Sequence, residues 1–289
     1  MQVCAIIGRV LLCLILGACY SHQEQVELNI KQLKQAEDAL MRNPKDAQAL
    51  SLIIGQLHDE KGVNRVNAAA VLGNVGQKTG AIIKDTAVPA LAELLDKGDA
   101  FDKRAAAEAL SHFGSNAREA VPILQKNLFP SDRDTAWFSA RALGEIGEAA
   151  GPAVPDLMRA LRENINECEG YFSNSCGSFI PAIAKIGSPA RSAEPELENF
   201  LKHRDPYVRM RIAVALIGVE PGSHSGYETL DNLLKSPDSQ VRRRTIDSVS
   251  EIGSRAAPIK GLIERSLKDP DEEVREAASA ELKLLNNWG

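Results

Sequence analysis

The sequence predicts an all-α solenoid, in which similar pairs of helices stack along one axis. Two landmarks recur at a step of 33 residues, a Val-Arg pair in the C-terminal half and a Val-Pro pair in the N-terminal half. These pairs begin at Val208, Val241 and Val274, and at Val88, Val121 and Val154. A period of about 20–50 residues is typical of repeat proteins, whose units pack only on their neighbours. Such folds mostly bind other molecules, so binding is the first function to consider.

The composition also favours stacked helices. Aromatic residues make up only 4% of the 289 residues, whereas Ala and Leu are abundant, so small aliphatic side chains must form the core. Such a core suits closely packed helices better than a sheet, which favours β-branched and aromatic residues. The formal net charge is −5, and neither sign dominates a long stretch.

The first 18 residues are predicted to be a signal peptide and no part of the fold. Arg9 is the only charged residue there, and the apolar run that follows, residues 10–16, is too short to span a bilayer comfortably. The run ends in Leu16-Gly17-Ala18-Cys19, which resembles the lipobox of bacterial lipoproteins.

The lipobox resemblance implies that Cys19 is acylated and becomes the mature N-terminus. Because more than one acyl chain is attached in such proteins, the anchor would be stable. Tyr20, in place of Asp, implies the outer membrane, with the protein facing the periplasm of a bacterial cell envelope. Loss of Arg9 would take the formal net charge from −5 to −6. The alternative is an ordinary cleaved signal in which Cys19 is incidental.

Two cysteines remain after export and anchoring, Cys168 and Cys176, and they flank an irregular stretch. An even pair in an oxidising compartment favours a disulfide, which would stabilise the fold by roughly 2–3 kcal/mol. Two free thiols whose Cα atoms lie too far apart are the alternative. A zinc site is poorly supported, because two Cys fall short of four ligands.

Each repeat is predicted to contain two helices. The first ends in a pattern that places Gly four residues after an aliphatic residue, and such a glycine supplies a left-handed helix cap. The second opens at the Val-Pro pair, because proline is tolerated in the first helical turn. The predicted cap glycines are Gly76, Gly114, Gly147, Gly187 and Gly253.

The chain divides into four predicted segments. Residues 1–18 are the signal peptide, 19–25 the lipidated tether, 26–61 the N-terminal capping helices, and 62–289 the solenoid with a C-terminal half-repeat cap. The repeat register breaks at residues 77–87, where a turn between helices is lengthened, and again at 165–178 and 221–227. Insertions in repeat proteins often lie on the binding face.

Three motifs resemble the HEAT family, in the variety called PBS-lyase-like HEAT repeats. They are the Asp-x-x-Val-Arg start, the Ala-Leu-x-x-x-Gly end and the Val-Pro-x-Leu second helix, and Arg141–Leu157 is the best copy. The resemblance covers residues 62–285 and implies a right-handed solenoid of about six to seven units. Ankyrin repeats are excluded because their Thr-Pro-Leu-His pattern is absent. Residues 43–50 look like a tetratricopeptide junction, although a degenerate HEAT cap explains them better.

An Asp and an Arg form a ladder along the C-terminal repeats. Each Asp stands where a helix needs an N-cap, and each Arg lies about one turn further on. The HEAT resemblance implies that these residues bridge adjacent units, and ligand binding is the alternative. The ladder residues are Asp205, Arg209, Asp238, Arg242, Asp271 and Arg275.

We expect no catalytic, cofactor-binding or metal-binding residues, and therefore no enzyme. No two of the five histidines are spaced as a metal pair on one helix. Deoxyhypusine hydroxylase, a HEAT enzyme, binds iron through His-Glu dipeptides, but here Asp59 follows His58 and Phe113 follows His112. Phycobilin lyases share the repeat type, yet no residue set for that activity is evident.

We expect no nucleic-acid partner, because binding nucleic acid requires a basic groove. The second helices, which usually line the inner surface of HEAT proteins, carry charges of both signs. The one basic run, residues 242–244, is more typical of a solvated helix face.

The scarce aromatic residues are candidates for contacts with a partner, since Trp and Tyr dominate binding energetics. They are Trp137, Tyr171, Phe172 and Tyr207. A core position is the alternative for Trp137 and its neighbour Phe138. The predicted function is that of a monomeric, lipid-anchored extracytoplasmic scaffold or assembly factor for an unidentified protein partner. The alternative is an enzyme or chromophore-handling protein of the PBS-lyase-like class.

Overall fold

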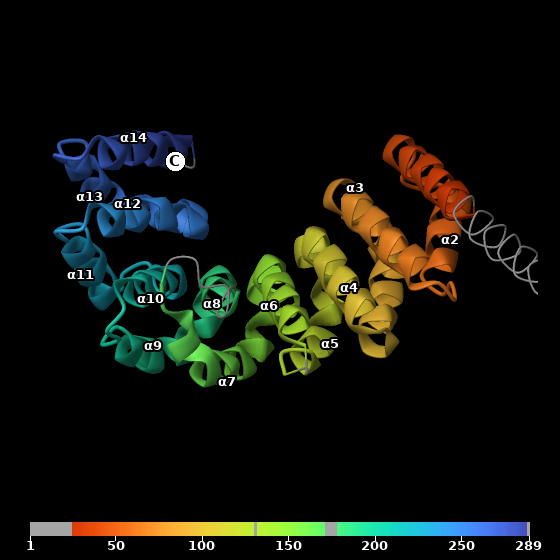
Figure 1. The fold of residues 1–289 in the computed structure, drawn as a ribbon, viewed down its shortest axis with the longest axis horizontal. Coiled ribbons are helices and arrows are strands. Elements are labelled where there is room, and N and C mark those ends of the chain that lie inside the picture. Colours follow the sequence, from red (N-terminus) through yellow and green to blue (C-terminus); the bar gives the residue numbers. More distant parts are fainter. Residues whose placement is uncertain (1–24, 130–131, 171–177, 288–289) are drawn as a thin grey trace, which may run out of the picture.

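The computed structural model describes residues 25–129, 132–170 and 178–287, and these contain helices and turns but no strand. Figure 1 shows an open arc of stacked helices, with residues 25–42 at one end and α14 at the other. The predicted all-α solenoid is confirmed. The signal peptide, Cys19, Tyr171, Phe172 and Cys176 lie outside the described residues, so the predictions made for them are untested.

The helices follow one another with short connections, and residues 25–42 form the first of them. The labelled helices are α2 (Ala47–Gln56), α3 (Gly62–Lys97), α4 (Ala100–Phe113), η1 (Gly114–Ala120), α5 (Val121–Lys126), α6 (Arg133–Ile146), η2 (Gly147–Ala153), α7 (Val154–Asn164), η3 (Ile165–Cys168), α8 (Phe179–Ile186), η4 (Ser188–Ala193), α9 (Glu194–Phe200), α10 (Pro206–Val219), α11 (His224–Leu233), α12 (Ser239–Asp247), η5 (Ser248–Ile259), α13 (Lys260–Ser266) and α14 (Glu272–Asn287).

The helices form two rows. In Figure 1, α4, α6, α8, α10, α12 and α14 line the inner side of the arc, and α5, α7, α9, α11 and α13 lie on its outer side. Consecutive inner helices pack directly on one another from α3 to α14. The first helix of each unit therefore faces inward. The expectation that second helices line the inner surface is wrong for this chain.

Four of the five predicted cap glycines have a positive φ. Gly114, Gly147, Gly187 and Gly253 have φ of 52°, 74°, 74° and 56°. Their ψ lies between −138° and −134°, a region that is open almost only to glycine. The first three end α4, α6 and α8 and lead into short 3₁₀ connections. Glycine at the helix end is therefore confirmed at these positions, but the predicted left-handed helical cap is not, because that cap requires a positive ψ.

The first unit differs from this pattern. Its chain stays helical from Gly62 to Lys97, through Gly76 and the whole segment 77–87. α3 nevertheless bends back on itself, since Arg65 near its start and Lys97 at its end line the same cavity. Pro89 lies inside α3 and cannot donate a backbone hydrogen bond, which favours a bend. The two-helix prediction holds here, but the predicted turn is helical.

Gly76 serves close packing instead of a turn, so the predicted left-handed cap is wrong there. It is buried and has no positive φ. A Cβ added at Gly76 would overlap the ring of Phe113 on α4. The glycine therefore allows the first two units to approach closely.

The Val-Pro pairs open second helices as predicted in the next two units. Pro122 and Pro155 lie in the first turns of α5 and α7.

Along the outer row, ion pairs connect neighbouring units. Their nitrogen–oxygen distances are 2.6 Å for Lys126–Asp96, 2.8 Å for Arg162–Glu196 and 2.6 Å for Arg265–Asp231. Exposed pairs of this kind contribute at most about 1 kcal/mol each.

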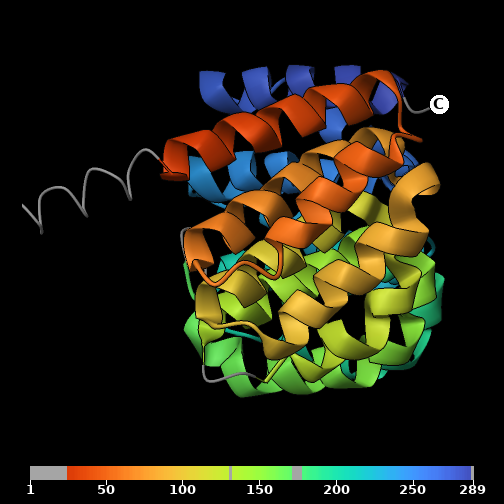
Figure 2. The ribbon, with the colours of Figure 1, turned by 90° about the vertical axis from the view of Figure 1, so that its right-hand side faces the viewer.

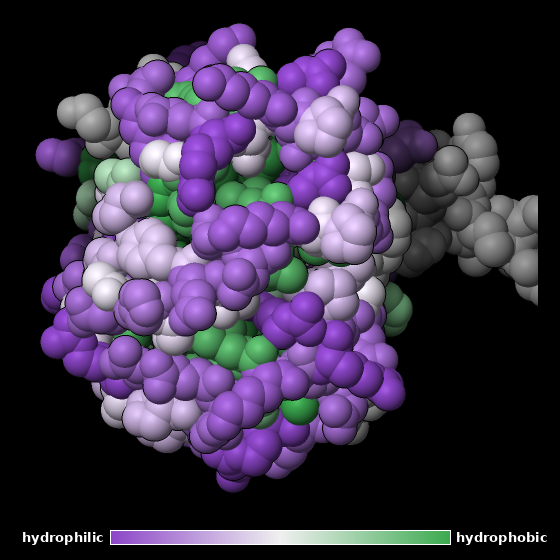
Figure 3. All heavy atoms as spheres, turned by 90° about the vertical axis from the view of Figure 1, so that its left-hand side faces the viewer, coloured by the Kyte–Doolittle hydropathy of each residue, from purple (hydrophilic) through white to green (hydrophobic). Residues whose placement is uncertain are grey.

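The surface is mainly polar. Figure 3, which faces the C-terminal units, shows hydrophilic side chains with small hydrophobic patches between them. Figure 2 shows the opposite end of the arc, with residues 25–42 and α2 in front. In the described part of the chain, no helix combines the length and the apolar character needed to cross a bilayer.

Candidate functional site

The ladder Asp residues lie at the starts of inner helices. The Asp205 carboxylate accepts hydrogen bonds from the backbone N–H groups of Tyr207 and Val208 at 2.8 and 3.0 Å. Asp238 accepts one from Gln240 at 2.8 Å, and Asp271 accepts those of Glu273 and Val274 at 3.0 and 3.3 Å. Each carboxylate thus satisfies N–H groups that the helix itself leaves unpaired.

The ladder Arg residues hold the loops that precede these helices. Each donates through Nη1 to the carbonyl oxygens five and six residues earlier. The acceptors are those of His203 and Arg204 for Arg209, Ser236 and Pro237 for Arg242, and Asp269 and Pro270 for Arg275. These contacts are local, because donor and acceptor belong to the same unit.

Arg242 also reaches the next unit. It donates two hydrogen bonds to the Asp269 carboxylate, at 2.9 and 2.8 Å, and both side chains are nearly buried. The Arg242 guanidinium holds the pKa of Asp269 below its usual range. This is the contact between units that the HEAT resemblance implies for the ladder.

A further copy of the ladder, missed in the sequence, lies at Arg65. Its Nη1 donates to the carbonyl oxygens of Asp59 and Glu60 at 2.9 and 3.1 Å, and its Nε donates to the Asp102 carboxylate at 2.9 Å. The sequence conceals this copy because Lys61 stands where the other units have Asp.

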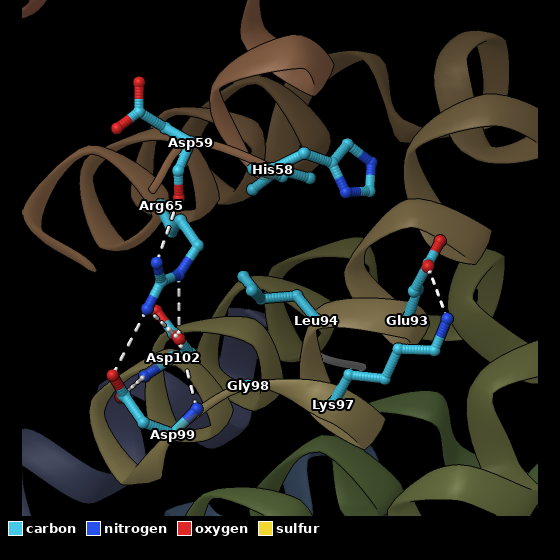
Figure 4. Close-up of a pocket in the computed structure, with 10 residues that line it drawn as sticks. His58, Asp59, Arg65, Glu93, Leu94, Lys97, Gly98, Asp99 and Asp102 are labelled. Carbon is cyan, nitrogen blue, oxygen red and sulfur yellow. Dashed lines mark hydrogen bonds and ion pairs between the residues drawn. The ribbon is translucent and has the colours of Figure 1, made fainter. Parts of the chain in front are cut away.

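Arg65 borders a small cavity between the loop after α2, α3 and the start of α4. Figure 4 shows Arg65 with Asp99 and Asp102 on one side and the Glu93–Lys97 pair on the other. The cavity has a volume of about 290 Å³. The Arg65 and Lys97 side chains that line it are already paired with carboxylates. These pairs join neighbouring loops, so the cavity is a weak candidate for ligand binding.

A larger hollow, which we call the α3–α6 cleft, lies between α3, α4, η1 and α6 and has a volume of about 680 Å³. The helical segment that breaks the repeat register forms one wall with Gln77 and Lys78. The inner helices α4 and α6 form the opposite wall. The cleft is lined by polar and charged side chains from all three helices: Gln77, Lys78, Glu108, Ser111, His112, Arg141 and Glu145.

Arg141 is the centre of the cleft's contacts. Its guanidinium donates to Glu108 at 3.1 Å and to the Ser111 hydroxyl at 3.3 Å, and both acceptors belong to α4. The guanidinium also lies over the rings of Trp137 and Phe138, 5.3 and 5.2 Å from their centroids. Cation–π contacts of this kind add roughly 0.5–2 kcal/mol. Trp137, a predicted contact residue, is half-buried and stacks on Arg141, although it does not itself line the cleft.

Other polar groups of the cleft are not engaged. Among the described residues, the side chains of Gln77, Lys78 and Asn116 form no hydrogen bond or ion pair. The Nδ1 atom of His112 is buried without a partner. Gln77, Lys78 and Asn116 can therefore bond to another molecule without breaking an existing contact, whereas the buried Nδ1 atom of His112 is out of its reach.

The inner side of the arc is closed at α10. Every residue from Ile212 to Val219 is buried. The start of the second register break lies against this helix, because Arg211 donates to the carbonyl oxygens of Cys168 and Gly170 at 3.1 and 3.3 Å. The Gly170 N–H donates in turn to Asp205 at 3.0 Å. The ladder residue Asp205 thus also anchors the insertion.

The remaining predicted site residues are spread over the molecule. Tyr207 is half-buried and packs against a small core cluster of Met210, Leu233 and Val241, and its role as a contact residue stays a prediction. Cys168 is buried, but Cys176 lies outside the described residues, and their disulfide stays a prediction. Within the described ranges, no group of three His, Cys, Asp or Glu side chains could hold a metal ion.

Comparisons with known proteins agree with this architecture. A model of HEAT repeats matches residues 50–144 and 194–283. No curated protein matches the chain in sequence. In the complex of CpcE and CpcF of phycocyanin lyase from Nostoc sp. PCC7120, the matching chain is 23% identical, with a TM-score of 0.54 over 82% of this chain and 94% of that one. An engineered protein is 21% identical, with a TM-score of 0.55 over 92% and 78%. The chain belongs to the HEAT-repeat family.

Proposed function

We propose that this HEAT-repeat protein is a lipid-anchored scaffold or assembly factor of the bacterial cell envelope that binds a segment of a partner protein in the α3–α6 cleft. The observation that carries the binding role is the cleft itself. It combines unengaged polar side chains with an arginine stacked on two aromatic rings. Trp and Arg are the residues most enriched where binding energy concentrates.

The anchor would place the solenoid close to the membrane. Cys19 stands six residues before the first described helical residue, Gln25. A connection of this length spans at most about 20 Å, since each extended residue covers about 3.3–3.6 Å. Labelled palmitate should be incorporated into the wild-type protein and lost from Cys19→Ala. Equal labelling of both, or of neither, would remove the anchor from the proposal.

The cleft is tested by photo-crosslinking in cells. A photoreactive amino acid at Lys78, in the cleft wall, is expected to give a discrete species of higher mass. The same amino acid at Glu148, an exposed residue of η2 outside the cleft, should not give that species. If both positions give the same products, or neither gives any, the cleft is not the binding surface.

A matched pair of arginine variants refines this test. Arg141→Ala should reduce the crosslinked species at Lys78 about 10-fold. Loss of a residue that contributes about 1.4 kcal/mol to the binding free energy lowers the affinity by that factor. Arg159 makes a similar cation–π contact, 3.7 Å above the Phe129 ring, but lies on α7 of the outer row. Arg159→Ala should leave crosslinking unchanged.

A chromophore-handling role is the second candidate, and the fold shared with the phycocyanin lyase chain supports it. It predicts a bound pigment that absorbs visible light in protein purified from its native cells. A colourless preparation that still crosslinks to a protein partner through Lys78 would contradict this role and leave the scaffold standing.

A further inference from the structure

Arg255, in η5, makes contacts that reach beyond its neighbouring unit. Its Nη1 donates to the carbonyl oxygens of Ala184 and Gly218 at 2.5 and 3.0 Å, and its Nη2 donates to that of Lys185 at 3.0 Å. Ala184 and Lys185 end α8, whereas Gly218 ends α10. One side chain therefore connects three successive units of the solenoid.

The acceptors suit a guanidinium in geometry and in charge. The last carbonyl groups of a helix lack partners within it and carry the negative end of the helix dipole. Arginine presents five N–H donors in a planar fork, so it can satisfy several carbonyl groups at once. A lysine ammonium in the same place has three donors on one atom and cannot reach all three acceptors with the same geometry.

Two glycines make room for this arrangement. A Cβ at Gly187 would lie 2.7 Å from Nη1 of Arg255, and a Cβ at Gly218 would lie 2.7 Å from the Ala184 oxygen. The same position at Gly218 is 3.0 Å from Ile252 of η5. The missing side chains thus let α8, α10 and η5 meet, and α8 packs directly on η5 although a unit separates them in sequence.

The contact is specific to this place in the described chain. Arg255 stands two residues after the positive-φ Gly253. The corresponding residues of the earlier units are Lys78, Asn116, Ala149 and Pro189, and none of them bonds to a unit two steps away. Elsewhere the curvature of the solenoid depends on contacts between neighbouring units, whereas at Arg255 one side chain fixes the curvature across three units.

We infer that Arg255 is a curvature lock, which holds α8, α10 and η5 together and thereby sets the distance between the two ends of the arc. This inference does not depend on the cleft or on the lipid anchor, because it concerns the shape of the scaffold. If the lock is removed, the arc can open at α10, and the inner side of that helix gains access to solvent.

Fluorescence energy transfer between labels on the two halves tests the lock in the full-length chain, purified in detergent. Labels are attached through unnatural amino acids at Lys45 and Lys283, which are both exposed and lie on opposite sides of the lock. In Arg255→Ala, the distance between the labels should lengthen and its distribution should broaden. Arg255→Lys should give an intermediate result. A second label pair, at Lys45 and Glu148, lies wholly on the N-terminal side and should not change.

Two further variants keep the test decisive. Arg265→Ala removes an exposed ion pair with Asp231, also between neighbouring units, and should leave the distance unchanged. Gly218→Ala keeps Arg255 but crowds the Ala184 oxygen, so it should open the arc even where Arg255→Ala does not fold. Distances in Arg255→Ala, Arg255→Lys and Gly218→Ala that equal the wild-type value would overturn the inference.

Discussion

Two of the three register breaks of this solenoid have opposite effects on the surface beside them. The segment 77–87 stays helical, so its backbone groups are paired within the helix and Gln77 and Lys78 remain available in a cleft. The start of the second break, residues 168–170, is not helical beyond Cys168. Its backbone groups bond to Asp205 and Arg211 instead, and the segment lies against α10.

This difference shows that the length of an insertion does not decide whether it creates a binding surface. Buried backbone N–H and C=O groups must be paired. An insertion that pairs them internally can project its side chains into solvent, whereas one that cannot must take partners from the surface it covers. The N-terminal half is consequently open at the α3–α6 cleft, and the C-terminal half is closed at α10.

The largest expected effect concerns a buried carboxyl group in the closed half. Glu281 of α14 is 5% exposed, and its Oε1 has no partner among the described residues. Burial, and secondarily the nearby Asp247 carboxylate, raise the pKa of Glu281 to about 7 from its ordinary 4.5. Its contribution to stability is therefore present below about pH 4.5 and is lost as the pH rises through 7.

Glu281→Gln should remove this loss. The raised pKa of Glu281 corresponds to about 3 kcal/mol of unfolding free energy, at about 1.36 kcal/mol for each pKa unit. The variant should therefore be more stable than wild type by up to that amount at pH 8. At pH 4 the two proteins should unfold at similar urea concentrations. Glu276→Gln, an exposed position on the same helix, should change stability little at either pH. Equal pH profiles for wild type and Glu281→Gln would contradict the assignment.

The open half should respond to pH in the opposite direction. The Arg104 guanidinium donates two hydrogen bonds to Asp132 and holds the pKa of that carboxylate well below its usual range. Stability from this pair is present above about pH 4 and is lost as the pH falls further. Hydrogen exchange at acidic pH should therefore rise first around α4 and α6.

The next effect concerns the close approach that forms the cleft. Gly76→Ala places a methyl group against the Phe113 ring and should destabilise the protein by about 1–3 kcal/mol, although alanine is the better helix former. Gly55 of α2 has no atom within 4 Å of its missing Cβ. Gly55→Ala should stabilise by about 0.5–1 kcal/mol. Urea unfolding of both variants measures the difference, and a change of the same sign in both would show that the cleft wall is not tightly packed.

The smallest effect separates two ladder residues. Asp205→Ala removes the N-cap of α10 and the acceptor of the Gly170 N–H, and should cost about 2 kcal/mol. Asp238→Ala removes the N-cap alone and should cost about 1 kcal/mol. Hydrogen exchange at residues 168–170 should increase only in Asp205→Ala. An increase in both variants would mean that the insertion is not anchored by Asp205.

The fold could be predicted from the sequence wherever a residue type has one structural use. Proline in the first turn of α5 is such a case. Gly76 misled the prediction because glycine serves two purposes, a special backbone angle or a close approach between helices. The same sequence pattern surrounds Gly76 and the glycines at helix ends. Only the ring of Phe113, one unit away, shows that Gly76 serves the close approach.

The site was less predictable, for a related reason. Trp137 could be singled out because aromatic residues are scarce, and its ring does lie under the Arg141 guanidinium, which lines the cleft. Tyr207 met the same criterion and is also half-buried, but it packs against Met210, Leu233 and Val241, far along the chain from the cleft. Arg255 was missed because its contacts are with main-chain carbonyl groups of distant units, which carry no signature in the sequence. Arg65 was missed because Lys61 stands in place of the ladder Asp.

The sequence separation between each arginine and its acceptors also limits where units can be duplicated. Arg209 and Arg275 bond to carbonyl groups five and six positions away, so a duplicated unit would bring its own loop support with it. Arg255 bonds to groups up to 71 positions away and Arg211 up to 43. A unit added or deleted between α8 and η5 would separate these partners. The number of residues between α8 and η5 is thus fixed by these contacts.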